Sequence, residues 1–413
     1  MAQLTETAAR PPRSRDAKII GLVSGAHFVS HVYMLVLPPL FAFVRADYVV
    51  SYAELGIAIA AFNVVSLVFQ PPAGFLADRF GARRLLIGGL VLSGIGVIIA
   101  GSIPSYWALV GGMALMGLAN TAYHPADYSI LSHSIPGRRI GQAFSIHTFF
   151  GTFGTAIAPV TMLFLAKLWG WHDAFVSASV FGFGMALVLL FSGNVLPEPG
   201  TGRRLVAASP AATGKTGWRL LFSPPIIRNV AFFVILSMAT GGISGFSIVA
   251  LGALYGTPIA TANFVLSAYL LCNAAGVLAG GYVATRARRH EFVASAGFIG
   301  SGALILLVGL VDMGAGILAI VMASSGFLNG VIQPSRDMIV RAATPPGSFG
   351  KVFGFVSTGF NFAGIAAPLL FGWLMDQAHP RSIFIVVAGL TLLSLPLLTG
   401  KPAHAPEAPV AAD

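Results

Sequence analysis

Residues 74–84 read GFLADRFGARR, and they lie between two long apolar stretches of the chain. No charged residue occurs between Glu54 and Asp78 before them, or between Arg84 and Asp127 after them. A charged side chain is costly at the centre of a bilayer, and a helix needs about 20 apolar residues to cross one. The stretch therefore predicts a short basic loop that joins two membrane-spanning helices.

The whole chain has the same composition. Charged residues make up 9% of its 413 positions and hydrophobic residues 56%, and the mean hydropathy is +0.83. These values are typical of an integral membrane protein. A single cysteine, Cys272, excludes an intramolecular disulfide and a thiolate metal cluster within one chain.

Charge-free intervals predict twelve spans. Single helices fit the intervals 18–45, 54–78, 139–167, 173–198, 291–312, 313–335, 351–376 and 381–401. Two longer intervals, 84–127 and 228–286, each hold a pair of helices, divided by turn residues at 102–105 and 255–258. We therefore expect an all-α membrane protein.

The positive charges predict the topology. With the N-terminus inside, the cytoplasmic loops and tails hold twenty Lys and Arg residues, whereas the external loops hold only Arg45, Lys167 and Arg381. The net charge of +10 then needs no nucleic-acid partner. We expect a multi-pass protein of a bacterial inner membrane with an uncleaved first span and both termini in the cytoplasm.

Two halves of the chain share one pattern. A shift of 209 residues places Asn120 on Asn329 and Pro125 on Pro334, in equivalent spans. Repeats of this kind place a solute site between the halves near the bilayer midplane. The predicted divisions are a cytoplasmic tail (1–18), a six-helix bundle (19–193), a cytoplasmic linker (194–228), a second six-helix bundle (229–399) and a cytoplasmic tail (400–413).

The loop at 74–84 closely resembles the signature of the major facilitator superfamily, with one residue inserted before the arginine pair. Residues 281–289 are similar to a degraded copy in the second half. The resemblance implies two pseudo-symmetric halves that transport a small molecule by alternating access. It also implies that Asp78 contacts the start of the eleventh span near Gly350 and holds the cytoplasmic side shut, unless the arginines only anchor the loop to lipid headgroups. The gating residues would be Gly74, Asp78, Arg79, Gly81, Arg83 and Arg84.

The fourth span carries a polar stripe. Asn120, His124 and Asp127 are spaced i, i+4 and i+7 on one helix face, with Tyr123 beside them. Residues 117–131 resemble the fosmidomycin-resistance branch of the superfamily, and Gly151 to Pro159 in the next span resembles a motif of exporters. Many drug/proton antiporters carry an Arg where this chain has Met113, which rules out coupling through that residue.

Each titratable group in this stripe has two interpretations. His124 can relay protons or bind an anionic solute, or it can donate a hydrogen bond beside the kink at Pro125. Asp127 can take part in the site, but we favour pairing with Arg79 or Arg83 in the gate.

The tenth span offers a counterpart stripe of Asn329, Gln333, Arg336 and Asp337. Pseudo-symmetry predicts that Arg336 faces His124 across the cavity, and that it pairs with Asp337 or a solute anion. In the first span, His27 and His31 share one face. Such a pair can bind metal, but without a third ligand nearby in the sequence we expect hydrogen bonding along the cavity and no metal.

The sequence contains no phosphate-binding glycine loop and no nucleophile triad, so we expect neither an enzyme nor a cofactor. The preferred function is proton-coupled export of a small polar or anionic compound by a monomeric secondary transporter. Uptake of an organic acid or another nutrient is one alternative. A membrane sensor that binds its ligand without net flux is another.

Overall fold

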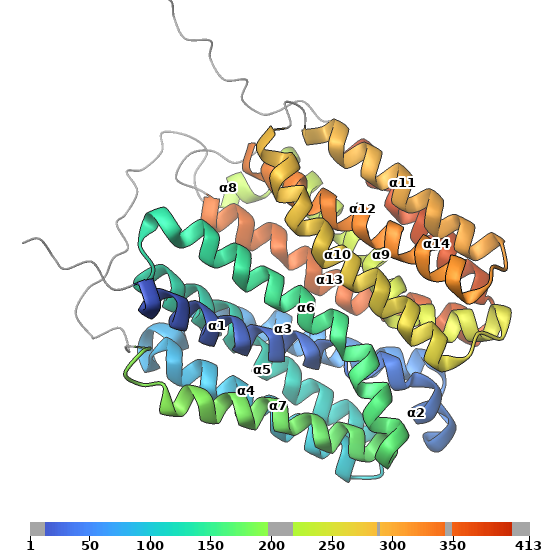
Figure 1. Cartoon of the computed structure of the whole chain (residues 1–413), viewed down its shortest axis with the longest axis horizontal. Helices are drawn as coiled ribbons and strands as arrows, with labels where there is room; N and C mark the ends of the chain where they lie inside the picture. Colours follow the sequence, from blue (N-terminus) through green and yellow to red (C-terminus); the bar gives the residue numbers. More distant parts are fainter. Residues whose placement is uncertain (1–12, 197–217, 287–289, 343–348, 399–413) are drawn as a thin grey trace, which may run out of the picture.

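The computed structural model describes residues 13–196, 218–286, 290–342 and 349–398, and every regular element in these ranges is a helix (Figure 1). The first half contains α1 (Arg13–Met34), η1 (Pro38–Leu40), α2 (Phe41–Tyr48), α3 (Tyr52–Phe80), α4 (Ala82–Ser102), α5 (Tyr106–Ser134), α6 (Gly137–Trp169) and α7 (Trp171–Phe191). The second half contains α8 (Trp218–Leu221), α9 (Pro224–Tyr255), α10 (Ile259–Arg286), α11 (His290–Leu310), α12 (Ala315–Ala342), α13 (Phe349–Asp376), α14 (Pro380–Leu393) and α15 (Leu395–Leu398).

The prediction of twelve spans is confirmed, with α1, η1 and α2 together forming the first span and α14 with α15 the last. Eleven spans are long and apolar enough to cross a membrane by hydropathy alone. The twelfth, α5, has a lower mean hydropathy than the other spans, because polar residues such as Asn120 and His124 interrupt it. The predicted turns at 102–105 and 255–258 are also confirmed, since α4 ends at Ser102 and α9 at Tyr255.

The two halves form two bundles that repeat one packing pattern. In Figure 1, α1–α7 (blue to green) lie together, and α9–α14 (yellow to red) form the second bundle beside them. Gly117 of α5 lies directly against the backbone of Phe62 in α3, and Gly326 of α12 lies against the backbone of Tyr269 in α10. These glycines are 209 residues apart, so the same close approach of two helices occurs in both halves.

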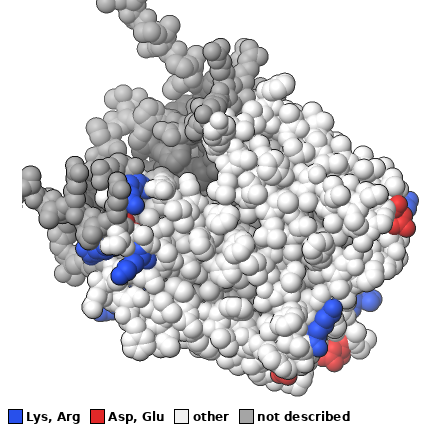
Figure 2. All heavy atoms as spheres, in the orientation of Figure 1, with Lys and Arg blue, Asp and Glu red and all other residues white. Residues whose placement is uncertain are grey.

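The surface is what a bilayer requires. Figure 2 shows a broad face without charged side chains, with Lys, Arg, Asp and Glu confined to the two ends of the helices. Large apolar side chains such as Val180, Phe191 and Ile320 are 69%, 80% and 69% exposed. Contiguous apolar surface of this kind is stable against lipid rather than water.

The halves meet along α3 and α13 and along α6 and α10. A continuous core of buried side chains joins them near η1, where the rings of Phe41 and Phe246 are 5.3 Å apart. A second and separate apolar core, which includes Ile226 and Val352, belongs to the second half alone. It lies toward the end of the molecule where α8 is seen (Figure 1).

Candidate functional site

The second part of α5 directs a carboxylate into the centre of the first bundle. Asp127 is fully buried, with 0% of its side chain exposed. Its Oδ2 atom lies 3.5 Å from Nδ1 of His27 on α1 and 3.7 Å from Nε2 of His147 on α6. Within the described residues, neither carboxylate oxygen has a hydrogen-bond donor at bonding distance.

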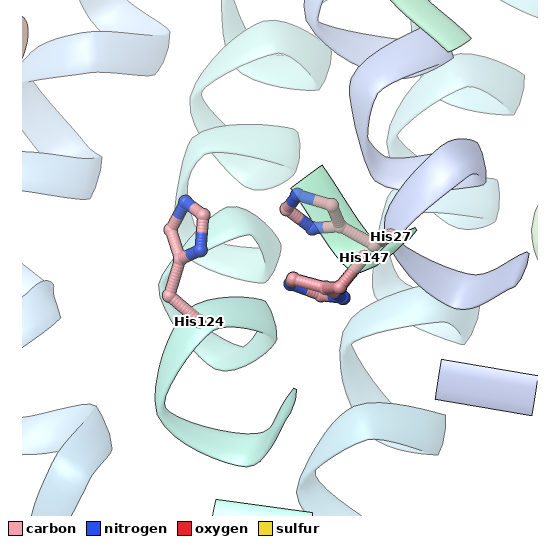
Figure 3. Close-up of side chains that lie close together, drawn as sticks. All are labelled: His27, His124 and His147. Atoms are coloured by element: carbon pink, nitrogen blue, oxygen red, sulfur yellow. The ribbon is translucent and has the colours of Figure 1, made fainter. Parts of the chain in front are cut away.

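Three imidazole rings from three different helices come together here, and two of them, His27 and His147, lie beside this acid. His27 stacks on His147 with ring centroids 3.8 Å apart, and the ring of His124 lies 5.2 Å from that of His27. Figure 3 shows the three side chains reaching toward a common space from α1, α5 and α6. We call His27, His124, His147 and Asp127 the histidine cluster.

Glycines on α6 make the cluster possible. A Cβ atom at Gly151 would lie 2.6 Å from Nε2 of His27, which is too close for any real contact, and 3.0 Å from Nε2 of His31, which is tight. Gly154, one turn later, packs directly against the backbone of Phe28. The Gly-x-x-Gly pattern therefore brings α1 and α6 together and leaves room for two imidazoles.

His31 extends the cluster by one helical turn. Its ring centroid lies 4.5 Å from that of His27, and its Nδ1 atom is 2.9 Å from the hydroxyl of Thr155 on α6. The structure thus places both histidines of α1 against α6, within the first bundle.

The rest of the predicted stripe on α5 faces other helices. Tyr123 is 2% exposed, and its hydroxyl lies 2.8 Å from that of Ser93 on α4. Asn120 donates a long hydrogen bond of 3.5 Å to Ser66 on α3. These two side chains join α5 to its neighbours rather than to the histidine cluster.

The stripe on α12 belongs to an amide network with α10. Asn273 donates to Asn329 at 3.0 Å, and Gln333 donates to Asn273 at 3.2 Å. The guanidinium of Arg336 lies 4.6 Å from the ring centroid of Phe233 and 5.9 Å from that of Phe360. The side chain of Asp337 lies outside the described residues, and the predicted position of Arg336 opposite His124 stays a prediction.

The predicted gating loop is described in part, since the contacts of Gly74 and of the Asp78 side chain lie outside the described residues. Gly81 has φ of +92° at the junction of α3 and α4, a backbone conformation that favours glycine. Arg83 donates to the carbonyls of Leu189 and Leu190 at the end of α7, at 2.9 and 2.7 Å from Nη2. A cation at a helix C-terminus is favourable, because the free carbonyls there carry partial negative charge.

The other two arginines of the loop are exposed. The guanidinium of Arg79 lies 5.4 Å from the ring centroid of its neighbour Phe80, and Arg84 has a partner as well. The preferred pairing of Asp127 with Arg79 or Arg83 is wrong. Helix α5 instead turns this acid toward the imidazoles of α1 and α6.

The fold brings His147 of α6 and His124 of α5 beside His27, although neither residue is near His27 in the sequence. Nitrogen atoms of the three rings lie within 4.8 Å of one another. An imidazole coordinates a metal in the plane of its ring, at about 2.0–2.1 Å. The rings of His27 and His147 are stacked at an interplanar angle of 22°, so their lone pairs do not converge on one ion. This geometry fits proton exchange or hydrogen bonding to a polar solute better than it fits a metal.

Comparison with known proteins places the whole chain in one family. A family model described as Major Facilitator Superfamily matches residues 23–257 and 230–413. A probable sulfoacetate transporter, SauU, of Cupriavidus necator is 22% identical over 404 residues, which cover 91% of this chain and 90% of that protein. The fosmidomycin resistance protein of Escherichia coli is 22% identical over 393 residues, which cover 91% of each chain.

Solved structures show the same fold. A bacterial homologue of the human lysosomal transporter Spinster, in an inward-facing and occupied conformation, has a TM-score of 0.74 at 13% identity and matches 94% of this chain and 97% of its own. The nucleoside transporter NupG has a TM-score of 0.74 at 13% identity, over 92% of this chain and 98% of its own. With a family match that runs through both halves, the chain belongs to the major facilitator superfamily and is a multi-pass membrane transporter.

Proposed function

We propose that this transporter exports a small polar or anionic compound in exchange for protons, by alternating access between its two halves. The observation that carries the proposal is the fully buried carboxylate of Asp127 beside the imidazoles of His27 and His147. Ionisable groups inside a membrane span are costly, and they mark proton relays and solute pathways.

The chemistry of the histidine cluster supports proton coupling. Imidazole gains and loses a proton near neutral pH, and a neighbouring carboxylate can accept one from it. The separations of 3.5 and 3.7 Å exceed the usual hydrogen-bond range. A small movement of either side chain would therefore make or break a proton-carrying contact, without any larger change in the helices.

An anionic solute is supported by one relative and one residue. Sulfoacetate, which the relative in Cupriavidus necator is named for, is an organic anion. Arg336 supplies a cation in the second half, next to aromatic rings. A cation in a low dielectric is stabilised when an anion approaches it.

The direction of transport rests on the exporter-like glycines of α6 and on the likeness to a drug-resistance protein. The sulfoacetate relative favours the second candidate, uptake of an organic acid. A sensor on the same scaffold would bind its ligand without net flux.

We further propose that the protein is a monomer in the inner membrane, with both termini and the linker 194–228 in the cytoplasm between bundles 19–193 and 229–399. The cytoplasmic gate would be Asp78 against the start of α13 near Gly350. Asp78→Asn should then slow transport and leave membrane insertion intact.

Everted membrane vesicles test the function. Respiration makes their lumen acidic, so a proton-coupled exporter should accumulate external solute, and an uncoupler should abolish the accumulation. The probes are fosmidomycin and sulfoacetate. If neither is transported into the vesicles, a thermal-shift screen of purified protein against metabolites follows. Accumulation that persists with the uncoupler would contradict proton coupling. A ligand that binds without flux in proteoliposomes would favour the sensor.

A further inference from the structure

The N-terminus of α3 has four backbone N–H groups with no carbonyl acceptor in their own helix, because no earlier turn precedes them. Two of them are satisfied locally, because Ser51 and Glu54 form a capping box: the Ser51 hydroxyl accepts from the Glu54 amide, and the Glu54 carboxylate accepts from the Ser51 amide. The other two belong to Tyr52 and Ala53. Both donate to the carboxylate of Asp376, each at 2.8 Å.

Asp376 is the last residue of α13, which belongs to the other half of the protein. A carboxylate at the C-terminal end of its own helix is unfavourable, because the free carbonyls there carry partial negative charge. The positive end of α3 compensates for this cost. The carboxylate of Asp376 therefore destabilises the end of α13 by itself and stabilises the junction between the two halves.

Small residues hold the two helices at the distance that the contact needs. A Cβ atom at Gly372 would lie 2.6 Å from the carbonyl oxygen of Tyr52, and one at Gly56 would lie 2.4 Å from that of Pro368. The backbones of α3 and α13 therefore touch over the first turns of α3. The hydrogen bonds from Tyr52 and Ala53 lie where this tight seam ends.

We propose that Asp376 is a gate residue, which fastens the start of α3 to the end of α13 in the access state seen here and releases it when the halves part at this end. Release would leave the amides of Tyr52 and Ala53 to water, so the contact stabilises one access state and not the other. The inference rests on transport by alternating access. It does not depend on the proposed protons, solute or direction.

The position of the contact complements the predicted cytoplasmic gate. Helices α3 and α13 run antiparallel, so the end of each lies beside the start of the other. Asp78 stands near the end of α3 and is expected to face the start of α13, whereas Asp376 ends α13 and faces the start of α3. One pair of helices would therefore carry a carboxylate gate at each end, and only one gate would be closed at a time.

Distances between spin labels test the proposal without any solute. The labels go on Trp107→Cys at the start of α5 and Leu310→Cys at the end of α11, which are 73% and 53% exposed at the same end as Asp376 but in different halves. The background is Cys272→Ala. Asp376→Asn keeps one oxygen to accept from one amide but removes the negative charge and the second acceptor, so it should raise the ratio of long to short distances by about fivefold, which corresponds to about 1 kcal/mol.

Asp47→Asn is the matched control, because the Asp47 carboxylate contacts Trp171 and His172 within the first half. It should leave the distances unchanged. If Asp376→Asn gives the same distribution as Asp47→Asn, the proposal is overturned.

A second pair of variants removes the donor in place of the acceptor. Tyr52→Pro deletes one of the two amides at a position where proline is well tolerated in a helix, and Tyr52→Ala keeps the amide. Tyr52→Pro should shift the distances more than Tyr52→Ala does, and Asp376→Asn should add little to it. Equal shifts for proline and alanine, or full additivity with Asp376→Asn, would show that the hydrogen bonds do not hold the gate.

Discussion

Nδ1 of His27 lies 3.5 Å from Oδ2 of Asp127, and the two side chains are 5% and 0% exposed. The contact joins α1 to α5 in the interior of the first bundle, and His147 of α6 approaches the same oxygen at 3.7 Å. One carboxylate therefore links three helices through groups that exchange protons. Such a link changes when its protonation changes, which is what coupling to protons requires.

Asp127→Asn should abolish uphill transport and spare exchange of solute for solute. The amide is isosteric with the acid but cannot take up a proton, so the step that uses the gradient is lost while both access states survive. Accumulation in everted vesicles and counterflow in proteoliposomes measure the two activities. Asp47→Asn, outside the histidine cluster, should leave both at the wild-type level, and an Asp127→Asn protein that still accumulates solute would disprove the assignment.

Gly151→Ala should damage the histidine cluster from the side of α6. Its Cβ atom would lie 2.6 Å from Nε2 of His27, so the ring must move or the helices must part, at a cost of about 1–3 kcal/mol in the free energy of unfolding. Thermal unfolding in detergent and vesicle transport should both fall. Gly184→Ala on α7 is the control, since nothing lies within 4 Å of a Cβ atom there. Equal stability and equal transport in the two variants would mean that α6 can accommodate a Cβ atom at Gly151 without displacing His27.

Binding of an anionic solute should depend on pH through His124 and on charge through Arg336. Protonated imidazole donates to an anion and neutral imidazole is a weaker partner, so affinity should rise as the pH falls. His124→Gln should flatten that dependence, whereas Arg336→Gln should weaken binding at every pH. His27 and His147 lie beside His124, and Asp127 lies beside those two, so the pH profile must be measured in each single variant. A ligand whose affinity neither change alters would remove the anion site.

The topology is tested by labelling single cysteines in intact cells, in a background without Cys272. Ser105, between α4 and α5, should react with an impermeant reagent from outside. Ala212 of the predicted linker should react only after the membrane is opened. The reverse pattern would invert the topology and exchange the two gates.

The fold could be predicted from the sequence because the bilayer limits where charged residues can lie along the chain. Charged residues are rare within the spans, although Asp127 lies inside α5 and Arg336 inside α12, so the intervals between charges predicted twelve helices. The repeated Asn-x-x-x-x-Pro of α5 and α12 predicted the two halves. The one helix that hydropathy alone misses, α5, is the helix that carries Asp127. The polar residues that lower the hydropathy of α5 include those that form the site.

The site was readable only in part, because helical spacing fixes a face but not the neighbour that the face meets. His124 and Asp127 do lie together, but Asp127 meets imidazoles of α1 and α6 and not the arginines of the loop. Nothing in the sequence pairs His147 with another histidine, and only the packing of α6 on α1 places its ring against that of His27. Asp376 gave no signal, since an acid at the end of a span is unremarkable until its partner in the other half is known.

The contact of Asp376 with α3 breaks the symmetry of the duplication. The shift of 209 residues places Asp376 on Lys167, in the last turn of α6, the helix that meets α10 at the other seam. A lysine there suits the C-terminus of its own helix and needs no partner across the seam. The two seams at this end therefore differ: the carboxylate of Asp376 joins α13 to α3, whereas Lys167, its counterpart on α6, is a cation that suits the end of its own helix. We expect the two halves to separate at this end first along α6 and α10, and along α3 and α13 only when the hydrogen bonds to Asp376 break.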